Sequence, residues 1–393
     1  MADILSGIRV LDFGRYIAGP FCAALLADYG ADVLRIEKPG GGDDRYVLPV
    51  AGDGSGSMFL QMNRNKRSLT LEPTSEGGRE IVRRLVAWAD VVVANVPAST
   101  LAAMGLDYPT LAAIRPDIIL TTASAFGSSG PYSERVGFDG VGQAMSGSVY
   151  LSGTPEQPVR SMVSFVDFTT GLSSAYGTVL ALLERQKTGR GQIVEGSLLR
   201  SALNLSNLFI IEQAATGADR VATGNRSQTS GPGDIFKTTD GWIIVQVVGD
   251  RLFARWALLV GADDWIADPR FASDTARGIN GAAISARMSA WCADRSTEAV
   301  LAALEKARVP AGPVHSPQQV LDDPHVLAAG LLERVAYPGL SEPAALAATP
   351  VTLSGQPVTL ARAPLPGEHT DLVLAELGYD PAAIAGFRSA GVI

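Results

Sequence analysis

Asp167 is the residue of this sequence with the clearest capacity for covalent chemistry. It lies in SFVDFTTG (164–171), and Arg160 is the only other charged residue between positions 158 and 183. A carboxylate in such an apolar segment caps a helix, accepts a buried hydrogen bond or reacts. As a nucleophile it would attack an activated acyl carbon and form a mixed anhydride, which apolar neighbours would shield from water. Composition alone favours the alternative, an N-cap for a helix that begins near Phe168.

Two glycine-rich or cation-rich segments are candidates for binding an anionic ligand. EKPGGGDDR (37–45) places three consecutive glycines between Lys38 and Arg45, and the backbone N–H groups of such a run are free to face an anion. NRNKRSLTL (63–71) adds three cations within four positions, which are Arg64, Lys66 and Arg67. Each cluster by itself is also typical of a solvated turn. Because both lie in one part of the chain, together they predict a phosphate-bearing ligand.

The other motifs that we searched for are absent or incomplete. Glu37 stands where an acid that binds a ribose would stand, but Gly14 and Gly19 do not form G-x-G-x-x-G, so we expect no nicotinamide cofactor. Neither G-x-S-x-G nor H-E-x-x-H occurs, which argues against a Ser–His hydrolase and a zinc hydrolase. The two cysteines fit no metal motif, so we expect no metal. We interpret Asp139, in VGFDGVGQ, as a helix cap.

The composition is that of a globular protein with a sizeable core. Of 393 residues, 47% are hydrophobic and 18% are charged, which argues against wholesale disorder. The net charge of −8 argues against a nucleic-acid partner. The chain starts with no basic-then-apolar leader, and no uncharged run approaches the ~18 apolar residues of a membrane span. We therefore expect a cytoplasmic protein with no membrane partner.

A parallel α/β scaffold must position these residues, because strand–helix–strand order repeats along the first half of the chain. The expected strands are 8–13, 31–37, 91–95 and 117–126, and the expected helices are 21–30, 78–90, 106–115, 170–185 and 202–217. Further on, 235–247 predicts an antiparallel hairpin, and 282–309 has a helical pattern. We expect a large Rossmann-like parallel-sheet domain, 1–219 completed by 316–393, and a smaller α+β domain, 220–315.

Several segments, taken in order, resemble the class III CoA-transferases, whose relatives include formyl-CoA transferase, carnitine CoA-transferases and α-methylacyl-CoA racemase. The resemblance runs nearly end to end. The segments that carry it are GIRVLDFGRYIAGPFCAALLADYGADVLRIEKPGGGD (7–43), NRNKRSLTL (63–71), TGRGQIVEGSL (188–198), VPAGPVHSPQQVLDDPHVLAAG (309–330) and LPGEHTDLVLAELGY (365–379).

The resemblance implies a role for Asp167, which lies where the family has its nucleophilic aspartate. By this analogy it attacks the thioester of an acyl-CoA donor and passes CoA to a carboxylic acid acceptor, through an aspartyl anhydride and an aspartyl-CoA thioester. The positions that match CoA-contacting positions of the family are Tyr16, Ile17, Ala18, Lys38, Leu71, Asn95, Met104, Arg135 and Phe138. The loop SQTSGPGD (227–234), with Ser230, Gly231 and Gly233, matches a loop that covers the aspartate in relatives.

Two departures from the family pattern bear on function. Ala103 stands where relatives commonly have an arginine that binds a phosphate of CoA, and Arg67 is a candidate replacement. Phe138 stands where the racemase branch has a proton-transferring histidine, which argues against a racemase or isomerase. A CoA-binding subunit without catalysis is the other alternative. Arg226 is a candidate partner for a substrate carboxylate.

The family also implies an assembly. Its chains are ring-shaped and interlock as dimers, with each active site between the large domain of one copy and the small domain of the other. We expect a homodimer on this ground. A heteromer is possible, and because this chain keeps Asp167 it would then be the active subunit.

Overall fold

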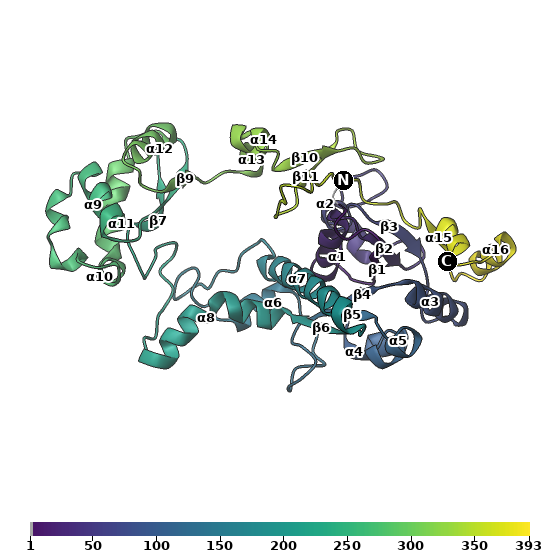
Figure 1. Cartoon of the computed structure of the whole chain (residues 1–393). Helices are drawn as coiled ribbons and strands as arrows, with labels where there is room; N and C mark the ends of the chain where they lie inside the picture. The colour runs from purple at the N-terminus through teal and green to yellow at the C-terminus, as the bar shows by residue number, and fades with distance from the viewer. Residues whose placement is uncertain (1–2) are drawn as a thin grey trace. The chain divides into compact units, whose positions relative to one another are not determined.

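The computed structural model describes residues 3–393, which fold as an α/β protein with a six-stranded parallel sheet (Figure 1). The chain divides into two compact units. The first contains the residues up to 146 together with 161–210 and 328–393, and the second contains 147–160 and 211–327. The second unit thus begins earlier and ends later than the expected small domain, and it takes in a segment, 147–160, that no sequence pattern singled out.

The sheet of the first unit has the strand order of a doubly wound fold. All neighbouring strands are parallel, in the order β3-β2-β1-β4-β5-β6. The strands are Arg9–Asp12 (β1), Asp32–Glu37 (β2), Arg67–Thr70 (β3), Val91–Ala94 (β4), Ile119–Ser124 (β5) and Gln192–Ser197 (β6). The expected parallel α/β sheet is therefore confirmed. Because the order reverses between β1 and β4, a crevice is expected at the carboxyl ends of these two strands.

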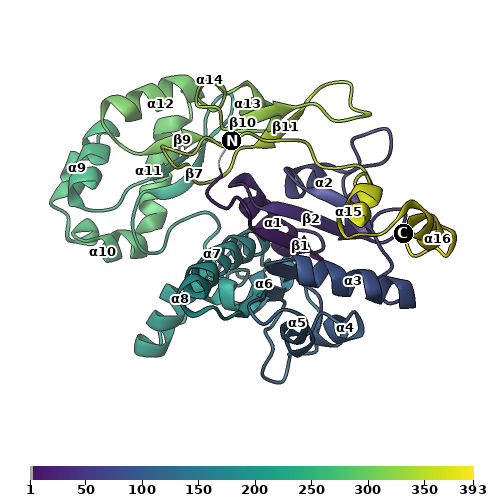
Figure 2. The same cartoon turned by 45° about the vertical axis from the view of Figure 1, so that its right-hand side comes forward.

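Helices cover both faces of this sheet (Figure 2). Successive side chains of a strand point to opposite faces, so Val10 packs with α1 and α7, whereas Leu11 packs with α3 and α5. The helices of the first unit are Ala18–Asp28 (α1), Ser57–Met62 (α2), Glu76–Trp88 (α3), Ala98–Ala103 (α4), Tyr108–Ile114 (α5), Asp139–Met145 (α6), Phe165–Thr188 (α7), Thr370–Glu376 (α15) and Pro381–Ser389 (α16). A hairpin of Leu332–Val335 (β10) and Ala344–Ala347 (β11) packs beside α2. Leu198–Thr216 (α8) runs from the first unit into the second.

The second unit is built on a three-stranded antiparallel sheet. The strands are Gly233–Lys237 (β7), Trp242–Gln246 (β8) and Ala311–Pro313 (β9). The helices are Asp250–Leu259 (α9), Asp274–Ile279 (α10), Gly281–Cys292 (α11), Thr297–Lys306 (α12), Pro317–Asp322 (α13) and Pro324–Ala328 (α14). The predicted hairpin is confirmed by β7 and β8. The helical pattern of 282–309 is confirmed and belongs to two helices, α11 and α12, because Ser296 accepts a hydrogen bond from the Ala299 N–H and starts α12.

Gly171 lets α7 approach α1 closely. A Cβ at this position would lie 2.8 Å from the backbone oxygen of Ala18 and 3.1 Å from Cδ1 of Phe21. We expect Gly171→Ala to lower the free energy of unfolding by about 1–3 kcal/mol, since the added methyl must push the two helices apart. Gly386 of α16 is a matched control, because nothing lies within 4 Å of its Cβ position. Gly386→Ala should raise stability by roughly 0.5–1 kcal/mol in a denaturant titration. Losses of equal size in the two variants would contradict the close-packing argument.

Candidate active site

A cavity of about 240 Å³ lies where the strand order of the sheet reverses. It lies wholly within the first unit and is formed by the segments that follow the carboxyl ends of β1, β4, β5 and β6, together with the start of α7. Its lining residues are Arg15, Tyr16, Ile17, Asn95, Val96, Pro97, Ala123, Ser124, Ala125, Ser133, Arg135, Val136, Gly137, Phe138, Asp167 and Leu198. The topology of the sheet therefore creates the crevice that holds Asp167.

The turn between β1 and α1 forms one wall of this cavity, and side chains from other segments hold it in shape. Asn95 Oδ1 accepts a hydrogen bond from the Arg15 N–H at 2.6 Å, and Asn95 Nδ2 donates to the Arg15 carbonyl at 2.7 Å. Tyr16 has a φ of 62°, an uncommon value for a side-chain-bearing residue, and its N–H donates to Asp44. The Tyr16 ring meets Phe138 edge to face at 5.5 Å. Asn95 thus fixes the turn that presents Tyr16 to the cavity.

Asp167 is the third residue of α7 and does not cap it. The N-cap position belongs to Ser164, whose side chain makes no capping hydrogen bond. Asp139 caps the helix instead, because its Oδ2 accepts from the N–H groups of Val166 at 2.8 Å and Asp167 at 3.0 Å. The interpretation of Asp167 as an N-cap is therefore wrong, and that of Asp139 as a helix cap is confirmed. The reason is tertiary: the capping acid comes from α6 and not from the adjoining sequence.

The Asp167 carboxylate faces the cavity without a polar partner. Among residues 3–393 it forms no hydrogen bond and no ion pair. Burial, and after it the negative charge of Asp139, raise the pKa of Asp167 to about 7. A carboxyl group with such a pKa still ionises near neutral pH and is a stronger nucleophile than an ordinary aspartate once ionised.

The raised pKa of Asp167 predicts a cost to stability that depends on pH. Since the folded pKa lies above the ordinary 3.8, the stability that Asp167 contributes is complete below pH 3.8 and is lost as the pH rises through 7. We therefore expect Asp167→Asn to raise the Tm at pH 8 and to leave it nearly unchanged at pH 4. Asp240 is a control of opposite sign, because hydrogen bonds from Thr297 lower its pKa. Asp240→Asn should lower the Tm at pH 8, and the same shift in both variants would contradict the assignment.

Four other predicted CoA contacts lie outside the cavity lining. Ala18 and Leu71 are 1% and 0% exposed, so their side chains are closed to any ligand in this structure. Met104 packs against the core beside α4 and α5. Lys38 is half-exposed, and its Nζ lies 2.6 Å from Asp43. Contact of these four residues with CoA stays a prediction, whereas Tyr16, Ile17, Asn95, Arg135 and Phe138 share the cavity with Asp167.

The cations of the two basic segments are mostly buried in ion pairs, which corrects the prediction that they bind phosphate. Arg64 pairs with Asp28 at 2.6 Å and Lys66 pairs with Asp12 at 2.7 Å, and all four side chains are fully buried. Arg67 pairs with Asp32 and Glu376, so it is not a free replacement for the arginine missing at Ala103. Composition cannot distinguish a solvated cation from a buried one, because only the fold supplies the partner.

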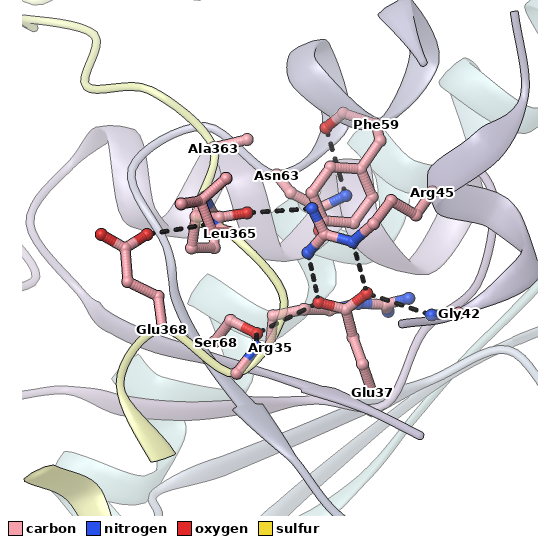
Figure 3. Close-up of polar contacts among 12 residues, drawn as sticks. Arg35, Glu37, Gly42, Arg45, Phe59, Asn63, Ser68, Ala363, Leu365 and Glu368 are labelled. Carbon is pink, nitrogen blue, oxygen red and sulfur yellow. Dashed lines mark hydrogen bonds and ion pairs between the residues drawn. The ribbon is translucent and has the colours of Figure 1, made fainter. Parts of the chain in front are cut away.

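Arg45 is likewise buried in an ion pair and is not free to bind a phosphate (Figure 3). Its guanidinium donates two hydrogen bonds to Glu37, at 2.6 and 3.1 Å, and one to the Pro364 carbonyl, and it lies 3.7 Å from the centre of the Phe59 ring. Glu37 is therefore engaged by Arg45, as well as by the hydroxyl of Ser68, and is not available as a ribose-binding acid. This buried pair ties the C-terminal segment to the sheet.

The predicted substrate loop belongs to the second unit. Ser227 N–H donates to the Gly233 carbonyl at 2.6 Å, and Val247 N–H donates to the Pro232 carbonyl, so the loop is held against β7 and β8. Ser230 is buried. Coverage of Asp167 by Ser230, Gly231 and Gly233 stays a prediction, as does a role for Arg226.

The described residues contain neither a metal-binding cluster nor a helix that could span a membrane. No group of three or more His, Cys, Asp or Glu side chains in residues 3–393 is placed to hold a metal ion. Within the same range, no helix is long and apolar enough to cross a membrane.

Two residues at or near the site, Arg15 and Gln143, were not predicted from the sequence. Arg15 lies in the cavity lining, and its guanidinium pairs with Asp43 at 2.9 Å. Gln143 donates to Asp139 through Nε2. One signal was available for Gln143, because residues four apart lie on the same face of a helix. No local signal pointed to Arg15, since its neighbours in space come from distant segments.

A comparison with protein-family models identifies the chain. Residues 5–370 match the model of CoA-transferase family III. The chain belongs to this family. It is 35% identical over 341 residues to succinyl-CoA–D-citramalate CoA-transferase of Chloroflexus aurantiacus, covering 86% of this chain and 85% of the relative. It is 34% identical over 400 residues to human succinyl-CoA:glutarate CoA-transferase, covering 99% and 90%.

A solved structure agrees with this assignment. A CAIB/BAIF family protein from Brucella suis superposes with a TM-score of 0.82 at 35% identity, over 95% of this chain and 99% of that one. Family membership and the names of the relatives make the chain a class III CoA-transferase, which acts on CoA thioesters and carboxylic acids. The expectation from the sequence motifs is thus confirmed at the level of the family and the enzyme class.

Proposed function

We propose that this protein transfers CoA from an acyl-CoA thioester to a carboxylic acid with Asp167 as the covalent nucleophile. The observation that carries the proposal is the carboxylate of Asp167, which has no hydrogen-bond or ion-pair partner among residues 3–393 and lies in the cavity at the reversal of the strand order. A group that only stabilised the fold would be paired, as the buried acids Asp12, Asp28 and Glu37 are.

The reaction that we propose proceeds in four balanced steps. The Asp167 carboxylate attacks the thioester carbonyl carbon, the C–S bond breaks, and a mixed anhydride and CoA thiolate form. The thiolate attacks the aspartyl carbonyl carbon and expels the donor acid, which leaves an aspartyl-CoA thioester. The acceptor carboxylate attacks this thioester and forms a second anhydride. The released thiolate then attacks the acceptor's acyl carbon, which gives the new acyl-CoA and frees Asp167.

The apolar side chains of the cavity suit reactive anhydrides. Ile17, Phe138 and Leu198 line it beside Asp167, and exclusion of water slows hydrolysis of the intermediates. Phe138 has no group that can move a proton, and Asp167 is the only carboxylate among the lining residues. Both observations disfavour racemisation by two proton-transfer groups. The cavity is therefore suited to acyl transfer.

For the substrates we infer a dicarboxylic acid as acceptor and succinyl-CoA, or another thioester with a free carboxylate, as donor. The names of the two relatives contain succinyl-CoA together with citramalate or glutarate, which are dicarboxylates. Arg15 and Arg135 are among the lining residues, and guanidinium binds carboxylate well. Arg15 also pairs with the exposed Asp43 through one N–H group, and its other N–H groups can bind a second carboxylate. In this assignment the two arginines bind the carboxylate that does not react.

A panel of substrates tests the reaction and the substrate class together. Succinyl-CoA is mixed with glutarate, citramalate or the matched monocarboxylate pentanoate, and the acyl-CoA products are measured by mass spectrometry. We expect the dicarboxylates to be used on the order of 10-fold better or more, since a guanidinium left unpaired by pentanoate costs binding energy. Equal use of pentanoate would contradict the substrate class. CoA binding without product from any pair would support a non-catalytic subunit, and deuterium uptake at the α-carbon of a 2-methylacyl-CoA would support a racemase.

We further infer a cytoplasmic homodimer. The homodimer is supported by exposed apolar residues on α8, among them Leu203, Leu205 and Leu208, which are 39%, 47% and 60% exposed in the single chain. Analytical ultracentrifugation of the wild-type protein and of Leu208→Glu distinguishes the outcomes. A dimer that dissociates in the variant supports the inference, and a wild-type monomer contradicts it.

A further inference from the structure

Each amide N–H group in the first turn of α7 donates to an acceptor, and Asp139 is the acceptor for two of them. The Phe165 N–H donates to the Val163 carbonyl, and the Phe168 N–H begins the helical pattern by donating to Ser164. The two amides between them, of Val166 and Asp167, both donate to Oδ2 of Asp139. An uncapped first turn would leave these amides unsatisfied in a buried place. The nucleophile's own backbone is therefore bonded to Asp139.

Gln143 in turn holds Asp139. It lies one turn later on α6, and its Nε2 donates to Oδ1 of Asp139, the oxygen that the helix amides do not use. Its Oε1 accepts from the Ser161 N–H at 2.9 Å. Asp139 is 6% exposed and Gln143 is 1% exposed, so both are shielded from competing water.

The hydrogen bonds of Gln143 connect the segment at which the chain leaves the first unit to the segment at which it returns. The chain leaves the first unit after Ser146 and returns to it at Ser161, immediately before α7. Gln143 lies before the exit and bonds to Ser161 at the return. Close packing accompanies this, since a Cβ on Gly142 would lie 3.0 Å from Val166 Cγ1. The start of α7 is thereby attached to α6.

We propose that Asp139 is a positioning residue for Asp167: it fixes the first turn of α7 through the amides of Val166 and Asp167, and Gln143 fixes Asp139. The proposal rests on the proposed function, because the group being positioned is the nucleophile of that reaction. Phe138, the preceding residue, lines the cavity, so the start of α6 shapes the wall and holds the nucleophile at once. A displacement of about 1 Å at a reacting group costs on the order of 10²-fold in rate.

The charge of Asp139 gives this role a second, measurable consequence. The charged groups near the Asp167 carboxylate are Asp139, which is bonded to the Asp167 N–H, and Arg15 and Arg135 of the cavity lining. Of these, Asp139 is the one that contributes to the raised pKa of Asp167, after burial. Removing its charge while keeping its shape should lower the pKa of Asp167, whereas loss of a cap that lies away from the cavity, such as Asp380 of α16, should leave that pKa unchanged.

Three variants separate positioning, charge and plain stability. Asp139→Ala removes both acceptor and charge. Asp139→Asn keeps the acceptor for the helix amides but sets its NH₂ group against the Nε2 of Gln143. Asp139→Asn with Gln143→Glu restores a donor–acceptor pair at that contact. The matched control is Asp380→Ala, because Asp380 caps α16 by accepting from the Ala383 N–H and does not touch the cavity.

Two readouts are used on the full-length protein. The first is the pH profile of Asp167 labelling by a carbodiimide, which reacts with protonated carboxyl groups and needs no acyl-CoA. The second is the rate of CoA transfer, measured beside CoA affinity. We expect a wild-type labelling midpoint of about 7 and a lower midpoint in Asp139→Asn. Transfer should fall on the order of 10²-fold in Asp139→Ala with CoA affinity unchanged. The double variant should recover most of the rate lost in Asp139→Asn, and Asp380→Ala should transfer at the wild-type rate.

Either of two results would overturn the proposal. One is an Asp139→Ala variant that is folded, binds CoA and transfers at the wild-type rate. The other is a labelling midpoint that is the same in Asp139→Asn and wild type. If the wild type transfers no CoA with any substrate, the proposed function fails, while the carbodiimide profile still decides whether Asp139 controls the protonation of Asp167.

Discussion

Replacement of Asp167 by alanine is expected to abolish CoA transfer, with a loss on the order of 10⁴-fold or more, because no other carboxylate lines the cavity to take its place. Incubation of the wild type with the donor acyl-CoA, followed by hydroxylamine, should leave a hydroxamate on Asp167. Hydroxylamine attacks both the anhydride and the aspartyl thioester, so either intermediate is trapped. Peptide mass spectrometry locates the modified residue.

The variant must be distinguished from one that merely unfolds. Asp167→Ala is expected to bind CoA and to melt no lower than wild type at pH 8, since the lost carboxylate is an unfavourable, partly buried charge at that pH. Asp380→Ala, which removes a cap from α16, should keep full activity. A fully active Asp167→Ala, or a hydroxamate on a different acid, would refute the proposed nucleophile.

The largest expected effect on stability is at Arg45. Its guanidinium and the Glu37 carboxylate are both fully buried, 2.6 Å apart. Arg45→Met leaves Glu37 charged and unpaired inside the protein, which should lower the free energy of unfolding by about 3–5 kcal/mol. Glu37→Gln in the same chain removes the orphaned charge and should restore a large part of the loss. Urea titrations of the single and double variants measure the difference.

The same pair predicts how stability responds to acid. Burial tends to raise the pKa of Glu37, but the hydrogen bonds of Arg45 and the charges of Arg35 and Arg45 bring it below the ordinary 4.5. Its stabilising contribution is therefore present above pH 4.5 and is lost as the pH falls through the lowered value. The difference between wild type and the double variant should shrink as the pH falls below 4.5. A double variant as unstable as Arg45→Met would show that the guanidinium matters for its packing on Phe59 rather than for its charge.

Much of the first unit was predictable from local patterns. The segments IRVLDF, ADVLRIE and VVVAN contain β1, β2 and β4, and their Val, Leu and Ile residues are typical of buried strands. The hairpin at Asp240-Gly241 followed from its turn residues. Two strands, β3 and β6, were not predicted, because Arg67–Thr70 has a single large apolar residue, Leu69, and Gln192–Ser197 has only Ile193 and Val194.

The sequence by itself determined the family and the parallel α/β architecture, and it predicts the reactive aspartate, because these depend on residue types in a fixed order along the chain. The tertiary structure decided which charges are free. Arg45, Arg64 and Lys66 pair with buried acids, whereas Asp167 is left without a partner and Asp139 caps a helix that begins more than twenty residues later. The physical reason is that the protonation and reactivity of a side chain depend on its burial and on its neighbours in space, and those neighbours come from distant segments.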